Sequence, residues 1–217
     1  MSAVPLPTQV STARPPVRPI RRYTTEEWLA LEAKTGMRYE YLDGELLDIT
    51  AMAGGTIPHT KACGNVQRRL GNAVEKAGKG CYAFNEGMKL HVDRYNRYYC
   101  PDASVVCGEE EEGPVTGSYT NPTLVVEVVS PSSYKRDLGK RFKHYRSLES
   151  LRDYVLVYLD RYQVDVFSRD APRTIFRYQS FDGLESEAEF PSLGVSVSLA
   201  NIYERVAIIE TADDEAE

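Results

Sequence analysis

Long apolar runs are missing from this chain, and their absence excludes several classes of protein. No hydrophobic stretch in the 217 residues exceeds the length of a strand, whereas a membrane-spanning helix needs about 20 apolar residues. The first twenty residues also lack the apolar segment of a secretory signal. We therefore expect no contact with a membrane and a cytoplasmic location.

Cysteine is scarce, and its four positions form no familiar pattern. Cys63, Cys81, Cys100 and Cys107 include no C-x-x-C pair, and no pair of histidines lies nearby. This spacing favours free thiols in a reducing cytosol over a zinc site or a disulfide framework.

An excess of positive charge is also lacking. The chain holds 26 Lys and Arg against 32 Asp and Glu, for a net charge of −6. Binding of nucleic acid by bulk charge is therefore excluded. Any such contact must come from a local basic surface or through bound cations.

The most informative stretch that is present runs over residues 123–130, TLVVEVVS. Its short, β-branched character predicts a strand covered on both faces at the centre of a mixed or parallel sheet. Glu127 interrupts that strand, and a buried carboxylate costs several kcal/mol unless it is paired, protonated or bound to a metal. Either a salt bridge to a buried arginine or a role as metal ligand or general base would account for it.

A second carboxylate, Asp102, follows Pro101 at the start of a predicted strand over residues 103–107. Two neighbouring strands could bring Asp102 and Glu127 to one point at a sheet edge. Mg²⁺ prefers such hard oxygen ligands and keeps several waters, so two carboxylates and a carbonyl such as that of Val128 would suffice.

The other elements follow from local patterns. Thr24 and Glu27 form a capping box for a helix that Gly36 ends, and Asp43-Gly44 predicts a hairpin with a type I′ turn. Residues 1–21 and 208–217 are expected to be disordered tails around a single domain at 22–207. Further helices are predicted at 59–77, 132–147 and 200–206, strands at 81–92, 98–107, 153–159, 163–168, 174–181 and 193–199, and a hairpin start at Asp182-Gly183. The fold class is α/β of the mixed α+β kind, a central mixed β-sheet flanked by helices with additional β-hairpins.

Five blocks of this sequence follow one another in a characteristic order. They are RYEYLDGE at 38–45, YCPDASVV at 99–106, LVVEVVSP at 124–131, DLGKRFKHYR at 137–146 and LRDYVLV at 151–157. These blocks resemble the Uma-type restriction endonuclease family of the PD-(D/E)XK nuclease superfamily. The resemblance runs from about Arg22 to Val206, and it implies a restriction-endonuclease-like fold and a metal held by Asp102 and Glu127.

Glu40 matches the acidic residue of the first block, so the resemblance makes it a third candidate. The alternative is a solvent-facing glutamate on a hairpin. His59 could reach a phosphate, although a histidine at a helix start is more often a cap or surface residue. Lys89 could contact a phosphate or merely solvate a strand edge, and Tyr145 is expected in the core.

The sequence departs from the superfamily pattern at one position. The superfamily motif has Glu-x-Lys, and here the lysine position is Val129, on the same strand face as Glu127. In the family a lysine on the following helix takes over, and its position falls on Arg141, next to Lys140 and near Lys143. Helical spacing turns Arg141 toward the sheet and Lys140 away from it. Arginine can bind phosphate but cannot act as a neutral base.

The predicted function is an endonuclease that uses Mg²⁺ or Mn²⁺ to hydrolyse DNA. Asp102 and Glu127 would hold the metal, Glu40 would complete the acidic cluster, and Arg141 or Lys140 would stabilise the phosphate. The alternative is a nuclease-fold nucleic-acid-binding or interaction module without turnover. A homodimer is compatible with either prediction.

Overall fold

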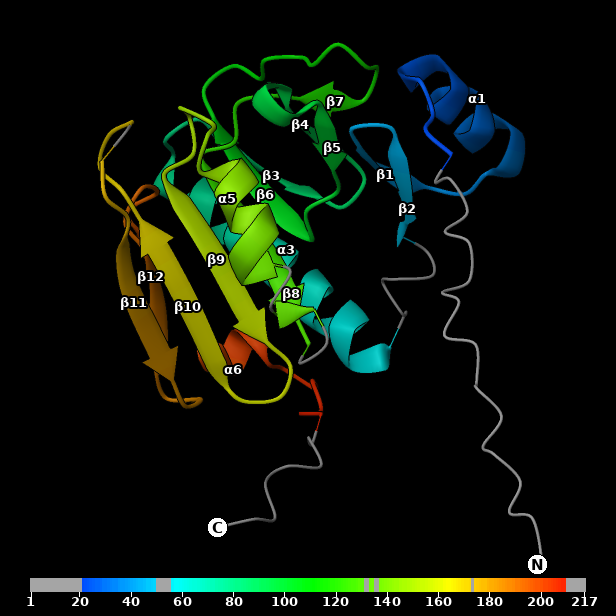
Figure 1. Ribbon diagram of the computed structural model, residues 1–217. Coiled ribbons are helices and arrows are strands. Elements are labelled where there is room, and N and C mark those ends of the chain that lie inside the picture. The colour runs from blue at the N-terminus through cyan, green and yellow to red at the C-terminus, as the bar shows by residue number, and fades with distance from the viewer. Residues whose placement is uncertain (1–20, 50–55, 131–132, 135–136, 173, 210–217) are drawn as a thin grey trace, which may run out of the picture.

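Three β-sheets and the helices that pack on them make up the part of the protein that the structure describes (Figure 1). The computed structural model describes residues 21–49, 56–130, 133–134, 137–172 and 174–209. Most of the tails expected at 1–21 and 208–217 lies outside these residues, as do residues 50–55 and Ser132, where the helix expected at 132–147 begins. Within the described part of the chain, no helix is long and apolar enough to cross a membrane.

The largest sheet has six strands in the order β11-β10-β9-β8-β6-β3. β8 pairs in parallel with β9, and the other neighbours are antiparallel, so the predicted mixed sheet is confirmed. β8 lies inside the sheet, and all six of its residues are buried, as its valine-rich sequence predicted. The strands are β3 (Cys81–Asn85), β6 (Ala103–Cys107), β8 (Leu124–Val129), β9 (Asp153–Tyr158), β10 (Gln163–Ser168) and β11 (Arg177–Asp182).

Both faces of this sheet are covered. The helix α3 (Ile57–Ala77) packs on one face, together with α6 (Leu199–Ile202) and the hairpin of β12 (Glu187–Phe190) and β13 (Val195–Ser198). The π-helical turn η2 (Asp137–Arg141) and α5 (Phe142–Tyr145) lie against the other face. Because parallel strands need a crossover connection, the chain between β8 and β9 must pass over the sheet, and it carries η2 and α5 with it.

A second sheet has the strand order β2-β1-β5-β4-β7 and lies beside α1 (Thr25–Thr35). The capping box of Thr24 and Glu27 is present, and Gly36 ends α1 with a φ of 69°. Asp43 and Gly44 join β1 to β2 with φ of 54° and 92°, as the predicted hairpin turn requires. The strands are β1 (Tyr39–Leu42), β2 (Glu45–Asp48), β4 (Lys89–Val92), β5 (Arg97–Tyr99) and β7 (Ser118–Tyr119), with a 3₁₀ turn η1 (Asp93–Tyr95) before β5.

Several predicted strands differ from those observed. The stretches 81–92 and 98–107 are not single strands, because each divides between the two larger sheets. A turn at Gly87, whose N–H donates to Asn85 Oδ1, separates β3 from β4, and Pro101 separates β5 from β6. Asp182-Gly183 does not start a hairpin with β11, since the following strand β12 pairs with β13.

The prediction of four free thiols is wrong. Cys81 and Cys107 are register partners on the antiparallel strands β3 and β6, with their Cα atoms 3.9 Å apart, and they form a disulfide. Cys63 and Cys100 are free. The sequence could not reveal the bond because it depends on the pairing register of two strands that are 26 residues apart.

Candidate active site

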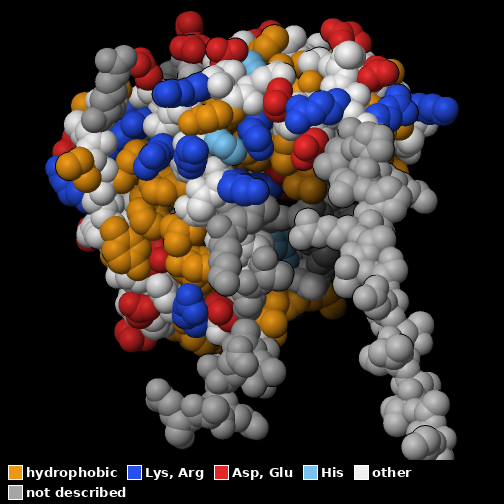
Figure 2. Space-filling model, in the orientation of Figure 1, with side chains coloured by type: hydrophobic (Ala, Val, Ile, Leu, Met, Phe, Trp, Pro, Cys, Tyr) orange, Lys and Arg blue, Asp and Glu red, His pale blue; other side chains and the backbone are white. Residues whose placement is uncertain are grey.

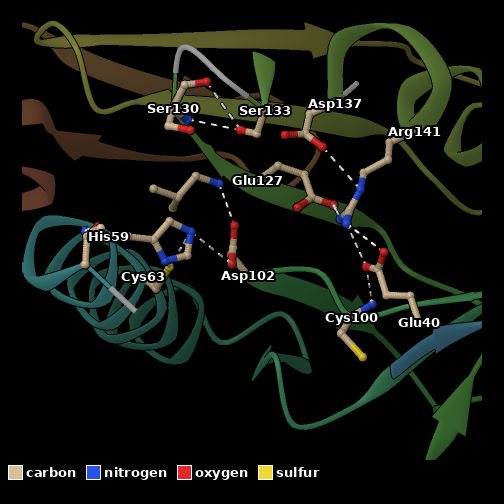
Figure 3. A network of polar contacts seen from close by, with 12 residues as sticks. Glu40, His59, Cys63, Cys100, Asp102, Glu127, Ser130, Ser133, Asp137 and Arg141 are labelled. Atoms are coloured by element: carbon tan, nitrogen blue, oxygen red, sulfur yellow. Dashed lines mark hydrogen bonds and ion pairs between the residues drawn. The ribbon is translucent and has the colours of Figure 1, made fainter. Parts of the chain in front are cut away.

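Asp102 lies where β6 and β8 separate. Their pairing ends at Ala103 and Val126, so Asp102 comes opposite Glu127 without a ladder bond. Its carboxylate instead accepts a hydrogen bond of 2.7 Å from the backbone N–H of Val128. The fork between the two strands therefore holds Asp102 beside β8, next to Glu127, as the sequence predicted (Figure 3).

Glu127 projects from the face of β8 that also carries Val125 and Val129, toward η2 and α5. Its exposed fraction is 4%. Arg141 donates to its Oε1 at 2.7 Å, and the hydroxyl of Tyr145 donates to the same atom at 2.8 Å. The described residues give Oε2 no hydrogen bond. Both hydrogen bonds to this carboxylate from the described residues thus go to one of its oxygens.

Arg141 joins three carboxylates at the end of η2. Besides Glu127, its guanidinium binds both oxygens of Glu40 at 2.7 and 2.8 Å. Its Nε lies 3.2 Å from Asp137, and the ring of Tyr99 lies 5.2 Å from its central carbon. Arg141 is buried and faces the sheet, as helical spacing predicted. The salt bridge to a buried arginine that the sequence allowed for Glu127 is therefore present.

Glu40 belongs to this cluster and not to the surface. Its exposed fraction is 1%, and the backbone N–H of Cys100 donates to Oε1 at 3.2 Å. The alternative of a solvent-facing hairpin glutamate is wrong, because β1 pairs with β5 and directs Glu40 inward. Tyr145 is in the core, as expected, but its hydroxyl also contacts Glu127.

Several carboxylates lie around Arg141. Its guanidinium contacts Glu40, Glu127 and Asp137, and Asp102 lies near Glu127. Burial raises the pKa of Glu127 to about 8, and the carboxylates around it act in the same direction against the attraction of Arg141. A cation bound near Glu127 would favour the ionised form of its carboxylate.

The raised pKa of Glu127 predicts how the cation-free protein responds to pH. An unfolded chain loses this proton near the ordinary value of 4.5, while the folded protein keeps it until about 8. The folded state then binds more protons in this window, so its free energy of unfolding should fall as the pH rises from about 5 to 8. Urea denaturation with a chelator present should show the fall, and Glu127→Gln should flatten it. Equal pH dependence in both proteins would contradict the shift.

His59 and Cys63 complete the surroundings of Asp102. The sequence suggested His59 as a possible phosphate contact but did not indicate Cys63 as a site residue. His59 Nε2 lies 3.6 Å from Asp102 Oδ1, and Cys63 Sγ lies 3.5 Å from His59 Nδ1. The pKa of His59 is raised, chiefly by Asp102. Their i, i+4 spacing in the sequence could have indicated that the two side chains lie together on one face of α3. Only the fold brings that face of the helix to the fork.

A cavity of about 550 Å³ opens beside these residues. His59, Cys63 and Asp102 line it, as do Arg38 and Cys100. Figure 3 shows His59 and Cys63 on one side of Asp102, with Glu127 and Arg141 on the other. A ligand in the cavity would therefore meet Asp102 directly.

The lysines proposed from the sequence lie away from the buried cluster. Lys140 and Lys143 are exposed, as expected for Lys140. With Arg97 they are close enough to His144 to help lower its pKa to about 4, behind the larger effect of burial. Lys89 pairs with Glu32 at 3.0 Å. We call Lys140, Lys143 and Arg97 the basic surface; Figure 2 shows that Lys and Arg side chains gather over this part of the molecule.

The donor atoms at the fork suit a hard divalent cation. Asp102 and Glu127 supply carboxylate oxygens from adjacent strands, and Glu127 Oε2 has no hydrogen bond from the described residues. Magnesium and manganese prefer oxygen ligands and retain water, which the cavity has room to supply. The residues present therefore fit such an ion.

Comparisons with known proteins agree with this architecture. The uncharacterized protein slr1290 of Synechocystis sp. is 32% identical over 197 residues, which cover 90% of this chain and 98% of that protein. The uncharacterized protein sll1609 of the same organism is 28% identical over 154 residues, which cover 69% of this chain and 82% of that protein. Both relatives match most of the chain.

A solved structure shares the fold. The crystal structure of "a putative nuclease belonging to DUF820" from Anabaena variabilis superposes with a TM-score of 0.62 at 19% sequence identity. The match covers 85% of this chain and 99% of that one. The predicted nuclease-like fold is therefore confirmed.

The family model Uma2, described as "Putative restriction endonuclease", matches residues 25–200. That range contains both strands of the fork, η2 and the whole carboxylate cluster. The chain therefore belongs to the Uma2 family of restriction-endonuclease-like proteins, as its five sequence blocks indicated.

Proposed function

We propose that this protein is an endonuclease that hydrolyses DNA phosphodiester bonds with Mg²⁺ or Mn²⁺. The observation that carries the proposal is the fork between β6 and β8. There Asp102 and Glu127 adjoin on neighbouring strands, beside a cavity. A protein that only bound DNA would have no use for two adjoining carboxylates, which repel phosphate.

Asp102 and Glu127 would hold the cation. When bound, the cation would supply the charge that orients an attacking water and neutralises the phosphate. The protein's own contribution is to hold the two carboxylates ready: Val128 N–H fixes Asp102, while Tyr145 fixes Glu127.

Arg141 is proposed as a positioning residue. Its N–H groups already meet Glu40 and Glu127, and its side chain is only 8% exposed. To contact a phosphate, Arg141 would have to break its contacts with Glu40 and Glu127, which would cost free energy because these carboxylates are buried. Its geometry thus favours a role in orienting Glu127 over direct stabilisation of the phosphate, and Glu40 in turn holds Arg141.

The basic surface supports nucleic acid as the substrate. Lys140, Lys143 and Arg97 offer local positive charge on a protein whose net charge is −6. Lys140 and Lys143 belong to the same crossover segment as Arg141. Arg141 extends from this segment to Glu127 at the fork. Contacts to backbone phosphates need no sequence readout and are sensitive to salt.

A binding module without turnover is the second candidate. It is favoured by Val129, which occupies the lysine position of Glu-x-Lys, and by Arg141, which already neutralises part of the charge on Glu127. Incubation of the purified protein with plasmid DNA, with Mn²⁺ or with a chelator, separates the two. Cleavage only with the metal supports the enzyme, and salt-sensitive binding without cleavage supports the module.

Metal binding itself should be measurable as thermal stabilisation. Mn²⁺ at a hundred times its dissociation constant should stabilise the folded state by about 2.7 kcal/mol. For a domain of this size that corresponds to a rise in Tm of about 5–10 °C. Differential scanning calorimetry of the parent and of Glu127→Gln checks this, since the variant should lose most of the shift. No shift in the parent at millimolar Mn²⁺ would contradict the metal site.

A further inference from the structure

The side chains of His59, Cys63 and Asp102 form a second group of donor atoms, distinct from the carboxylate pair. One ligand atom from each of the three lies within 4.8 Å of the other two. They supply one nitrogen, one sulfur and one oxygen. Nitrogen and sulfur donors suit a softer cation than Mg²⁺.

We propose that His59, Cys63 and Asp102 bind Zn²⁺ or a chemically similar ion such as Co²⁺, with a fourth position open to the cavity. The proposal goes beyond the nuclease assignment because it adds a cation class that the fork carboxylates alone do not select. The sequence argued against a zinc site because it lacks a C-x-x-C pair. The third ligand, Asp102, comes from a β-strand region 39 residues beyond Cys63 and is brought close only by the fold.

Two of the separations between the donor atoms are close to the edges of a tetrahedral site, and the third is within 4.8 Å. Zinc bonds of about 2.0–2.1 Å to nitrogen and oxygen and about 2.3 Å to sulfur imply edges of about 3.3 Å for N–O and about 3.6 Å for N–S. His59 Nε2 lies 3.6 Å from Asp102 Oδ1 and 3.8 Å from Cys63 Sγ. These two distances exceed the ideal edges by only a few tenths of an ångström.

One side chain must turn when the ion enters. Cys63 Sγ lies almost equally far from both ring nitrogens of His59, at 3.5 and 3.8 Å, so neither nitrogen lone pair points at a position shared with the sulfur. Both side chains are half-buried and line the cavity, which gives them room to rotate. Coordination would also deprotonate the thiol.

The open position faces the cavity of about 550 Å³, where water or a substrate oxygen could complete the coordination. Three protein ligands and one open position are typical of zinc sites at which chemistry occurs. Asp102 belongs both to this group and to the carboxylate pair. Occupancy by Zn²⁺ would therefore take a ligand from the proposed Mg²⁺ or Mn²⁺ site.

Cobalt spectroscopy tests the proposal without depending on activity. The full chain, freed of metal with a chelator and kept free of oxygen, is titrated with Co²⁺. A thiolate-to-cobalt charge-transfer band should appear, saturate at one Co²⁺ per chain and disappear when Zn²⁺ is added. Cys63→Ser should abolish the band, and His59→Gln should weaken Co²⁺ binding at least ~10-fold.

Cys100 provides the matched control. It is the other free cysteine among the described residues and lines the same cavity, so Cys100→Ser should keep the band. Absence of the band in the parent, or its survival in Cys63→Ser, would overturn the inference. Circular dichroism of each variant checks that the fold is retained.

The same preparations separate this inference from the proposed function. Glu127→Gln should keep the cobalt band, because Glu127 is outside the group of three. A band without plasmid cleavage in the parent overturns only the nuclease proposal. Cleavage with Mn²⁺ but no band overturns only the zinc-type site.

Discussion

Glu127→Gln should reduce Mn²⁺-dependent cleavage of plasmid DNA at least ~100-fold, the usual loss when a preorganised charge is removed from an active site. Glutamine keeps the size of the side chain and can still accept hydrogen bonds from Arg141 and Tyr145 through one oxygen. It removes the negative charge that would bind the cation. The initial rate of supercoiled plasmid nicking, at saturating Mn²⁺ for the parent, measures the effect.

The variant must also be shown to fold. Because Glu127 is buried with a raised pKa, loss of its charge should leave the cation-free protein at least as stable as the parent near pH 8. Glu45→Gln, at an exposed position of β2, is the matched control and should cut at the parent rate. If Glu127→Gln is stable and also cuts at the parent rate, the carboxylate pair is not the catalytic centre.

Arg141→Ala should lower the free energy of unfolding by about 3–5 kcal/mol, because it removes a buried cation that contacts three buried carboxylates. The substitution removes the ion pairs of Arg141 with Glu40, Glu127 and Asp137 at once. With about 2–4 °C per kcal/mol, the Tm should fall by about 6–20 °C. Chemical denaturation at pH 8 is the best measurement, since a lower pH would protonate the stranded carboxylates and hide part of the effect.

Lys140→Ala is the natural control for this experiment. Lys140 precedes Arg141 in η2 but is exposed, so its removal should change the free energy of unfolding by no more than about 0.5 kcal/mol. Arg141→Lys should recover part of the lost free energy of unfolding, because lysine restores the positive charge. The recovery should be incomplete, because one ammonium cannot replace the bidentate contact with Glu40. An Arg141→Ala protein as stable as the parent would show that the cluster is protonated and needs no cation.

Local patterns in the sequence predicted the elements whose stability is local. The capping box at Thr24 and the turn at Asp43-Gly44 are each satisfied within a few residues. The extent of α3 follows in the same way from its apolar spacing and the glycine that ends it. The valine-rich run of β8 likewise predicted a strand covered on both faces. The predictions of single strands at 81–92 and 98–107 failed because each stretch divides between two sheets, and that division depends on tertiary packing.

The candidate site shows the same division. The sequence by itself determined that a carboxylate lies inside a buried strand, that a second follows Pro101, and that Arg141 faces the sheet. Only the tertiary structure decided which groups meet there: Arg141 and Glu40 are separated by 101 residues, and Asp102 and Val128 by 26. Contacts over such separations depend on the order and register of strands and on the crossover above them. No local pattern encodes these features, because they minimise the energy of the whole packed core and its buried charges.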